Sequence, residues 1–535
     1  MKTPVYDVCV IGSGASGGVL AKELAESGAK VALIEAGREM KPEDFYFHTW
    51  PYEYPFKGTA RGVRPAYYPR EVTEAIRYED SDDIGIDHVR AVGGRTNHWN
   101  AVCLRFGPSD FRERSLEGVE DDWPITYEEL APYYSYVEKM IGVTGTKEGL
   151  DIVPDGEYLR PLNFRCSEMI VKQACKRLGI PIFPARKAVL TEPFDGRPPC
   201  HYCGRCMQGC DVGAVFNTAK TMIPKAQRTG NFTLFQNKAA REILVDREGK
   251  ARAVSVVDTQ TRREEEIRAR NFAVCCGTVQ SARLLLNSRS AQFPGGIANS
   301  SGLVGRYLSG HAGVEACGYL DDLVGTRPVN IDGATDHSYI PRFKKSKDYV
   351  GGFHYQMQFK GFMFPHHAYA LKGFGRAYKK EVRELFPALF QMAAFGKVMA
   401  NPNNRVTVDT HRPDAYGIPI PVIHFRFGEN EIAMCKDMMG TAHEILEEAK
   451  SRVILDTHPT PGGLASHEVG TARMGNDSKT SVLNAHGQAH DVKNLFVVDG
   501  SSFVTFPEKN PTLTIMALSV RASRYMSEQV KKGNL

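Results

Sequence analysis

The chain opens with a short apolar run that leads directly into a glycine-rich turn. Residues 6–11 (YDVCVI) have the apolar character of a buried strand. Apolar residues then recur at helical spacing: Val19, Leu20, Leu24 and Ala25. A second apolar run, residues 30–34, ends at Glu35. The order of strand, glycine turn, helix and strand predicts a βαβ unit at the start of the chain.

Two further stretches have the alternation that is typical of β-strands. Residues 239–274 consist of short strand-like runs separated by polar turns, which predicts a β-meander. Runs at 353–359 and 406–409 predict a second sheet within residues 308–457, with a helix over 429–452 beside it. The chain as a whole is therefore expected to be of the α/β class (α+β overall).

Composition and charge narrow the functions that the chain could serve. It has 535 residues, of which 42% are hydrophobic and 24% charged, and this length allows two hydrophobic cores. Lys and Arg number 67 against 62 Asp and Glu, and a net charge of +5 gives no reason to expect a nucleic-acid partner. No apolar run approaches the roughly 18 residues of a membrane span, so none is expected. The apolar run 8–11 is too short for a secretory signal.

The glycine turn has the pattern of a dinucleotide-binding site. Gly12 permits the tight turn after the first strand, Gly14 lets the backbone approach a pyrophosphate, and Gly17 lets the helix pack closely on the strand. The helix N-terminus offers N–H groups to phosphate. Glu35 ends the second strand, where its carboxylate can accept hydrogen bonds from the ribose hydroxyls. An acid at this position favours FAD or NAD over NADP.

Five further segments favour FAD. They are residues 93–99 (GGRTNHW), 271–288 (NFAVCCGTVQSARLLLNS), 466–475 (SHEVGTARMG), 495–503 (LFVVDGSSF) and 510–517 (NPTLTIMA). In this order the segments resemble those of the glucose–methanol–choline (GMC) oxidoreductases. The resemblance runs from Tyr6 to about Met526 and is weakest over residues 305–400. Within the family, the chain is most similar to the branch that contains pyranose 2-oxidase, glucoside 3-dehydrogenase and the flavin subunits of bacterial sugar dehydrogenases.

The resemblance implies FAD as the cofactor. It assigns the pyrophosphate to Gly12, Gly14 and Gly17, and the adenosine ribose to Glu35. It implies flavin contacts from three segments, namely Gly93, Gly94, Asn97 and His98, then Asp499 and Gly500, then Pro511 and Thr512. In pyranose 2-oxidase the histidine that matches His98 carries the flavin covalently. Both a covalent and a noncovalent flavin are therefore open for this chain.

The resemblance also implies a division into two domains. A discontinuous FAD-binding domain, Rossmann-like and of GMC type, is expected from residues 1–307 and 458–535. It would include the cysteine-rich loop 200–210. A sheet-based substrate-binding domain is expected from residues 308–457, which contain no catalytic motif.

Two residues near the C-terminus are candidates for the chemistry of alcohol oxidation. Hydride transfer to flavin N5 needs a base for the hydroxyl proton and a group that orients the oxygen. The resemblance implies His467, in SHEVGTARMG, as the base, and Asn510, in KNPTLT, as the orienting donor. Histidine suits the first role because its pKa lies near neutral pH.

Four of the twelve cysteines lie in one short loop. They are Cys200, Cys203, Cys206 and Cys210. Their spacing, C-x2-C-x2-C-x3-C, is typical of an iron–sulfur cluster, although Asp211 follows the last cysteine where proline is usual. Zinc and a disulfide are the weaker alternatives. By resemblance to bacterial flavin-dependent glucose dehydrogenases, three of the four would hold a [3Fe–4S] cluster, and Cys203 could complete a [4Fe–4S] cluster.

Together these features predict an FAD-dependent dehydrogenase of a sugar or glycoside hydroxyl, with a 3-keto glycoside as the favoured product. The cluster would pass electrons singly to an external, cytochrome-type acceptor. The alternatives are a glucose, gluconate or polyol dehydrogenase, a pyranose or C-glycoside oxidase that uses O2, and a non-catalytic flavin-binding subunit. The resemblance also implies a small partner subunit and a periplasmic location reached by export together with it, with the cytoplasm as the alternative.

Overall fold

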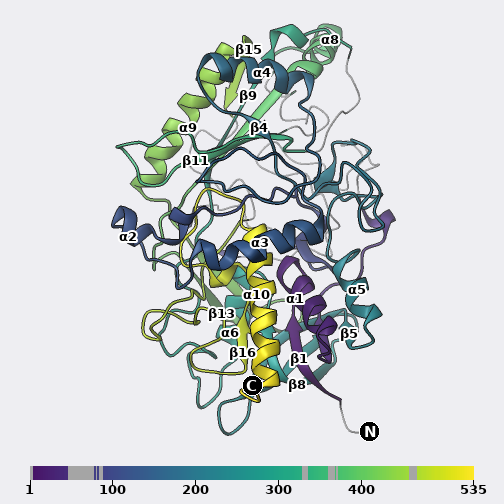
Figure 1. The fold of residues 1–535 in the computed structure, drawn as a ribbon, viewed down its shortest axis with the longest axis vertical. Helices are drawn as coiled ribbons and strands as arrows, with labels where there is room; N and C mark the ends of the chain where they lie inside the picture. The colour runs from purple at the N-terminus through teal and green to yellow at the C-terminus, as the bar shows by residue number, and fades with distance from the viewer. Residues whose placement is uncertain are drawn as a thin grey trace.

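Two large β-sheets, one at each end of the molecule, organise the chain (Figure 1). The computed structural model describes residues 4–45, 77–79, 81–82, 88–327, 335–358, 368, 371–456 and 467–535. The first strand and the C-terminal helix both lie at the lower end of the molecule in this view. Within the described residues, no helix is long and apolar enough to cross a membrane.

The lower sheet has seven strands in the order β5-β2-β1-β8-β7-β6, with β16 also paired to β8. They are β1 (Val5–Ile11), β2 (Val31–Ile34), β5 (Phe232–Phe235), β6 (Lys238–Val245), β7 (Ala251–Asp258), β8 (Glu264–Val274) and β16 (Leu495–Val497). β1 runs parallel to β2 and β8, whereas β6, β7 and β8 form the expected antiparallel meander. The second half of β8 is buried because β1 and β16 pair with it there.

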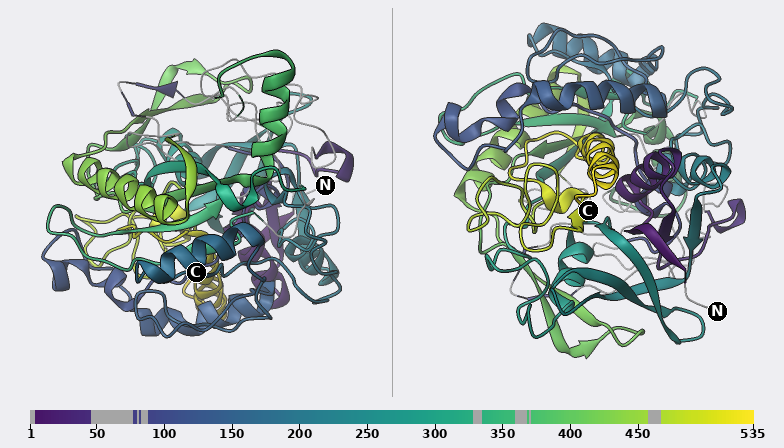
Figure 2. Two further views of the ribbon diagram at one scale, coloured as in Figure 1. Left: turned by 90° about the horizontal axis from the view of Figure 1, so that it is seen from above. Right: turned by 60° about the horizontal axis from the view of Figure 1, so that its bottom comes forward.

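Helices from both ends of the chain pack together beside the lower sheet. α1 (Ala15–Glu26) contacts α5 (Met222–Arg228) and α10 (Thr512–Lys531), and α3 (Tyr127–Ile141) crosses α10 (Figure 2). α1 begins directly after the extended Gly14 and ends before Gly28, whose φ of +95° suits a residue without a side chain. The predicted βαβ unit is therefore present as β1, α1 and β2.

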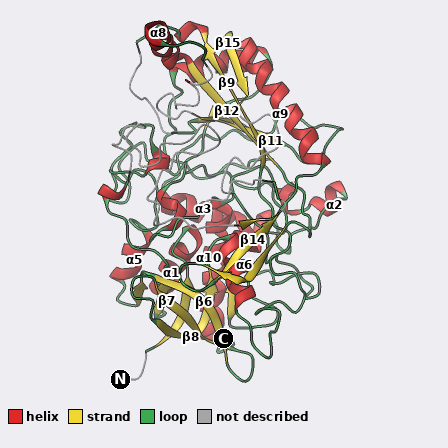
Figure 3. Ribbon diagram, turned by 180° about the vertical axis from the view of Figure 1, so that it is seen from behind, coloured by secondary structure: helices red, strands yellow, loops and turns green. Residues whose placement is uncertain are grey.

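The upper sheet has six strands in the order β15-β9-β12-β11-β10-β4. They are β4 (Phe183–Pro184), β9 (Ala312–Leu320), β10 (Ser338–Ile340), β11 (Phe353–Gln358), β12 (Leu389–Gly396) and β15 (Ser451–Asp456). The long helix α9 (Glu429–Glu448) packs against β9, β12 and β15 (Figure 3). This helix is shorter than the predicted 429–452, because Lys450 adopts a φ of +57° and the chain then enters β15.

A third, small sheet consists of β13 (Arg405–Pro413), β14 (Pro419–His424) and β3 (Arg77–Tyr78), and β13 and β14 pack on α6 (Thr278–Asn287). The other α-helices with bounds inside the described residues are α2 (Glu113–Glu117), α4 (Cys166–Arg177) and α8 (Gly375–Leu385). α4 packs on α9, and β4 joins the upper sheet. Both belong in sequence to residues 1–307, so contacts cross the predicted domain division, which stays a prediction.

Candidate functional site

In the glycine turn between β1 and α1, protein atoms lie close to Gly12 and Gly17 but leave space beside Gly14. Gly12 has a φ of +100°, and a Cβ added at Gly17 would lie 1.9 Å from the Gly12 carbonyl oxygen. A Cβ added at Gly14 would meet no atom within 4 Å. The turn therefore leaves space beside Gly14, at the N-terminus of α1, where a pyrophosphate can approach the backbone. These residues fit the dinucleotide that the sequence predicts.

Glu35 lies at the end of β2 with its carboxylate turned back to the glycine turn. One carboxylate oxygen accepts hydrogen bonds from the Ser13 N–H (3.2 Å) and the Ser13 hydroxyl (2.6 Å), and the other accepts from the Gly37 N–H (3.0 Å). Burial raises the pKa of this carboxyl above its usual value. Three of its acceptor positions are thus occupied by the protein, so a ribose hydroxyl would compete with the rotatable Ser13 hydroxyl.

The predicted flavin-contact loop, residues 93–98, closes against the glycine turn. The Gly93 N–H donates to the Ser13 hydroxyl oxygen (2.8 Å), and a Cβ on Gly94 would lie 3.2 Å from the Gly14 Cα. The Asn97 side-chain amide donates to the carbonyl oxygens of Val92 (3.0 Å) and Gly94 (2.9 Å). Asn97 therefore holds the shape of the loop, and Gly94 brings the loop to the N-terminus of α1.

His98 follows this loop and connects it to the cysteine-rich segment. Its Nδ1 lies 3.3 Å from the Met207 carbonyl oxygen, and its ring lies 5.4 Å from that of Phe45. Burial lowers the pKa of His98 to about 3, so its imidazole is neutral. The predicted flavin loop and the predicted cluster loop are thus in direct contact.

The two C-terminal cofactor segments also converge on this region. Asp499 follows β16, and its carboxylate accepts hydrogen bonds from the Gly277 N–H (2.8 Å) and the Ser281 hydroxyl (2.5 Å). The Gly500 carbonyl oxygen accepts from the Gly470 N–H (2.9 Å). Pro511 precedes the first residue of α10, Thr512, directly after Asn510. Asp499 therefore fastens the end of the lower sheet to α6, and Gly500 fastens it to the segment that carries His467.

His467 and Asn510, the predicted catalytic pair, lie together. The Nε2 of His467 is 3.5 Å from the Nδ2 of Asn510, and only 6% of Asn510 is exposed. Burial, and then the charge of Arg95, lower the pKa of His467 to about 3. The imidazole is consequently neutral at physiological pH, which is the protonation state that a base requires.

The upper sheet supplies a residue that orients Asn510. Gln356 lies on β11 and donates a hydrogen bond from its Nε2 to the Oδ1 of Asn510 (2.8 Å). The same Nε2 lies 2.9 Å from the Nε2 of His354. Because the Asn510 oxygen is already engaged, its NH2 group is the one that faces His467. The sequence interpretation missed Gln356 and His354, although alternate polar positions in an otherwise apolar strand are a signal for them.

A second histidine, also missed, lies against His467. The Nδ1 of His311 is 3.1 Å from the Nδ1 of His467, and its Nε2 is 3.0 Å from the Pro507 carbonyl oxygen. The His311 ring stacks on Phe506 with 4.3 Å between centroids, and Phe395 lies 6.0 Å from the His467 ring. No local sequence pattern marks His311, because it lies just before β9, far from the catalytic segments.

Glu468, the residue after His467, forms an ion pair with Arg95 of the flavin-contact loop. The two carboxylate oxygens of Glu468 lie 2.7 and 3.0 Å from the two terminal nitrogens of Arg95. Burial alone would raise the pKa of Glu468, but Arg95 and His88 hold it at about 2. The segment that carries His467 and the flavin-contact loop are thus fixed to one another through an ionised pair, in which the Glu468 carboxylate is buried and the Arg95 guanidinium is partly exposed.

The four clustered cysteines occupy a loop beside His98. Cys206 is buried and the other three are half-buried. All twelve cysteines of the chain lie in the described part, and none forms a disulfide there. Burial, and then the neighbouring Cys206, raise the pKa of the Cys200 thiol to about 12. Among the described residues, however, no three His, Cys, Asp or Glu side chains are arranged to hold a metal ion. The donor types fit a cluster, but the thiols would have to converge to bind one.

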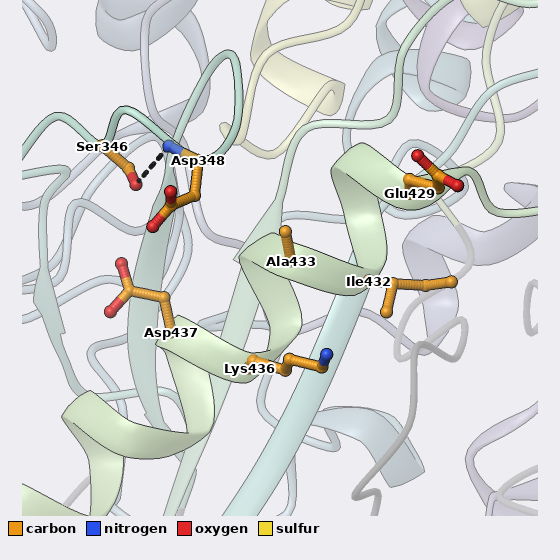
Figure 4. A pocket seen from close by; sticks show the side chains of 7 residues that line it. All are labelled: Ser346, Asp348, Glu429, Ile432, Ala433, Lys436 and Asp437. Carbon is orange, nitrogen blue, oxygen red and sulfur yellow. Dashed lines mark hydrogen bonds between the residues drawn. The ribbon is translucent and has the colours of Figure 1, made fainter.

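A separate hollow lies on the outer face of α9. It has a volume of about 640 Å³ and is lined by Ser346, Asp348, Glu429, Ile432, Ala433, Lys436 and Asp437 (Figure 4). None of these residues belongs to the catalytic pair or the cofactor segments. The hollow is open and carries charges of both signs, and we assign it no part in the chemistry.

Several curated oxidoreductases are similar to this chain over nearly its whole length. A 2-methyl-1,2-propanediol dehydrogenase of Mycolicibacterium austroafricanum is 31% identical, and the match covers 98% of this chain and 95% of that protein. The fructose dehydrogenase large subunit of Gluconobacter japonicus is 27% identical, with 98% of each chain covered. A C-glycoside 3-oxidase of Microbacterium trichothecenolyticum is 25% identical, with 99% of each covered.

The fold and the family agree with these relatives. The solved structure of a formate oxidase from Aspergillus oryzae superimposes with a TM-score of 0.67 at 14% identity, covering 99% of this chain and 100% of that one, which supports the fold alone. Two family models, both described as GMC oxidoreductase, match residues 9–312 and 400–519. The predicted fold class, family and FAD cofactor are confirmed: the chain belongs to the GMC oxidoreductases and is an FAD-binding enzyme.

Proposed function

We propose that this enzyme oxidises a hydroxyl group of a sugar or polyol. The observation that carries the proposal is the half-buried, neutral His467 beside the NH2 group of Asn510, 3.5 Å away. His467 would take the hydroxyl proton through Nε2, and Asn510 would donate a hydrogen bond to the hydroxyl oxygen. The flavin, when bound, supplies an acceptor for hydride. The fructose and 1,2-diol substrates named for the relatives support this substrate class.

Within this class we favour a secondary hydroxyl of a glycoside ring, which would give a 3-keto glycoside. The similarity to a C-glycoside 3-oxidase over 99% of the chain supports this choice. The similarity to a diol dehydrogenase and to a fructose dehydrogenase large subunit favours the second candidate, a polyol or free-sugar dehydrogenase. Both candidates use the same pair of residues and differ only in which substrate carbon is held beside it.

The test is anaerobic addition of single compounds to the purified, FAD-loaded protein while the absorbance band of oxidised flavin is followed. The compounds are methyl glucoside, sucrose, glucose, fructose, gluconate and 2-methyl-1,2-propanediol. Bleaching by methyl glucoside supports attack on a ring hydroxyl, because its C1 hydroxyl is blocked. Bleaching by the free sugars, gluconate or the diol alone supports the second candidate. Bleaching by none of them would contradict the sugar or polyol assignment. Reoxidation by air would indicate an oxidase.

We also propose that loop 200–210 holds an iron–sulfur cluster, of the [3Fe–4S] or [4Fe–4S] type. The spacing of the cysteines and the contact of Met207 with His98 support this proposal. A cluster would supply one-electron transfer next to the flavin-contact loop. Iron and acid-labile sulfide should co-purify with the protein under anaerobic conditions and be lost in Cys206→Ser. Cys435→Ser, which alters a buried cysteine of α9, is the control. Stoichiometric zinc without sulfide would contradict the proposal.

The partner and location belong to the same proposal. The name of the fructose dehydrogenase large subunit indicates that this relative has at least one further subunit. We propose a small partner subunit, a cytochrome-type acceptor and a periplasmic location reached by export with the partner. Cell fractionation with affinity capture tests this. A protein found alone in the cytoplasm would contradict it.

A further inference from the structure

A backbone bridge holds the segment of His311 beside the segment of His467. Ser309 and Val469 form an antiparallel bridge in which each N–H donates to the other's carbonyl oxygen at 2.9 Å. His311 follows Ser309 by two residues and His467 precedes Val469 by two, so this antiparallel bridge brings the two histidines to the same place. The Nδ1 atoms of the two rings lie 3.1 Å apart there.

One proton position in this pair is fixed by a carbonyl group. The Nε2 of His311 lies 3.0 Å from the Pro507 carbonyl oxygen, which can only accept a hydrogen bond. If Nε2 carried no hydrogen, its lone pair would face a lone pair of the Pro507 carbonyl oxygen in a buried site. His311 Nε2 must therefore carry a hydrogen and donate it to Pro507.

The second proton position follows from the neutrality of His311. Its ring is 2% exposed and packs between Phe506, at 4.3 Å, and Phe395, at 5.8 Å. Burial, and then the neighbouring His467, lower the pKa of His311 well below its usual value. A neutral imidazole carries one proton, so His311 Nδ1 is an acceptor. The hydrogen in the contact between the two rings then belongs to Nδ1 of His467.

We propose that His311 is a positioning residue that fixes the tautomer of the base. By accepting the Nδ1 hydrogen of His467, it keeps the Nε2 lone pair of His467 free on the side that faces Asn510. When a substrate hydroxyl loses its proton, that O–H bond breaks and a new N–H bond forms at Nε2 of His467. The resulting imidazolium still donates from Nδ1 to His311, so the contact survives the proton transfer. This inference rests on the proposed function of His467 as the base.

The test compares two substitutions of His311 in the FAD-loaded enzyme. His311→Asn keeps an acceptor near the position of Nδ1, whereas His311→Leu removes it. We expect the rate of flavin reduction at saturating substrate to fall about 10- to 100-fold in His311→Leu, with the dissociation constant of the substrate unchanged. His311→Asn should recover most of this rate. An equal loss in both variants, or an undiminished rate in His311→Leu, would overturn the inference.

A spectroscopic readout decides the tautomer without substrate. In enzyme labelled with 15N-histidine, the two ring nitrogens of His467 can be assigned by the signals that vanish in His467→Ala. We expect Nδ1 to be protonated and Nε2 bare in the wild type and in His311→Asn, and this preference to be lost in His311→Leu. A protonated Nε2 in the wild type would overturn the inference. If no compound bleaches the flavin, the proposed function fails, and this measurement still decides the role of His311.

Discussion

The predicted site has a nucleotide end at the lower sheet and a hydroxyl end next to the upper sheet, and different chemical groups form the two ends. At the lower sheet, the nucleotide end is made of backbone: Gly14 leaves room for a cofactor through the absence of a side chain, and Gly12 and Gly17 let the turn and α1 pack closely. Next to the upper sheet, the hydroxyl end is made of polar side chains from separate segments, among them the buried Gln356 and Asn510 and the half-buried His467. The nucleotide end depends on a particular local backbone conformation. The hydroxyl end depends on a hydrogen-bond partner for every buried polar group.

This difference decides how each end tolerates change. A side chain added at Gly14 fills space that the cofactor needs, whereas one added at Gly12 or Gly17 collides with the backbone of the protein itself. A side chain removed at the hydroxyl end leaves a buried donor or acceptor without its partner, which costs about 1–3 kcal/mol. The nucleotide end should therefore respond in cofactor affinity, and the hydroxyl end in the rate of the chemical step.

The largest expected effect is that of His467→Ala. Loss of the base should slow flavin reduction about 10²- to 10⁴-fold, because proton abstraction then falls to water. The flavin content of the purified protein and its melting temperature should stay near the wild-type values, since the nucleotide end is untouched. His443→Ala is the control, because His443 lies at the surface of α9, where its Nε2 is 2.7 Å from Asp456. A flavin-loaded His467→Ala enzyme of normal rate would contradict the assignment of the base.

Gly14→Ala should have the opposite profile. The φ of Gly14 is −64°, which alanine adopts readily, and the added Cβ meets no protein atom within 4 Å. The apoprotein should fold normally, whereas the affinity for FAD should fall about 5- to 150-fold, the result of about 1–3 kcal/mol of crowding. Titration of apoprotein with FAD measures this. Gly440→Ala, on α9 with equal free space, is the control. Unchanged FAD affinity in Gly14→Ala would show that no phosphate approaches Gly14.

The same contrast explains how much the sequence could predict. The turn from Gly12 to Glu35 forms within one βαβ unit, so local spacing was sufficient to predict it, and the structure agrees. His467 and Asn510 were predicted from family motifs, and the structure brings their side chains together. Gln356 and His311 were missed, because their roles depend on which strands pair and in which register, and that is settled by packing of the whole chain. The contribution of β4 to the upper sheet escaped prediction for the same reason.

Gln356→Met tests the support behind the catalytic pair. The change keeps the length of the side chain but removes the donor to the Asn510 oxygen. Asn510 can then rotate its amide, and we expect the rate of flavin reduction to fall about 10-fold, with a smaller change in substrate affinity. Gln260→Met, on an exposed turn of the meander, is the control. A change confined to substrate affinity would mean that Gln356 contacts the substrate and does not orient Asn510.

The smallest expected effect is that of mild acid on kcat/KM. FAD affinity should respond to acid at a higher pH than kcat/KM does, which distinguishes the nucleotide end from the hydroxyl end. The base works when neutral, and burial lowers the pKa of His467 to about 3, so lowering the pH from 8 to 5 should change kcat/KM by less than about twofold when FAD is in excess. At the nucleotide end, burial raises the pKa of Glu35, so its carboxyl takes up a proton at a higher pH than an ordinary glutamate does. FAD affinity should therefore decline, as the pH falls, before the base is titrated. Parallel profiles of kcat/KM and of FAD dissociation measure this order. An acid limb in kcat/KM near pH 6.5 with FAD fully bound would mean that the base is solvated in the working enzyme, and the contrast between the two ends would then fail at its hydroxyl end.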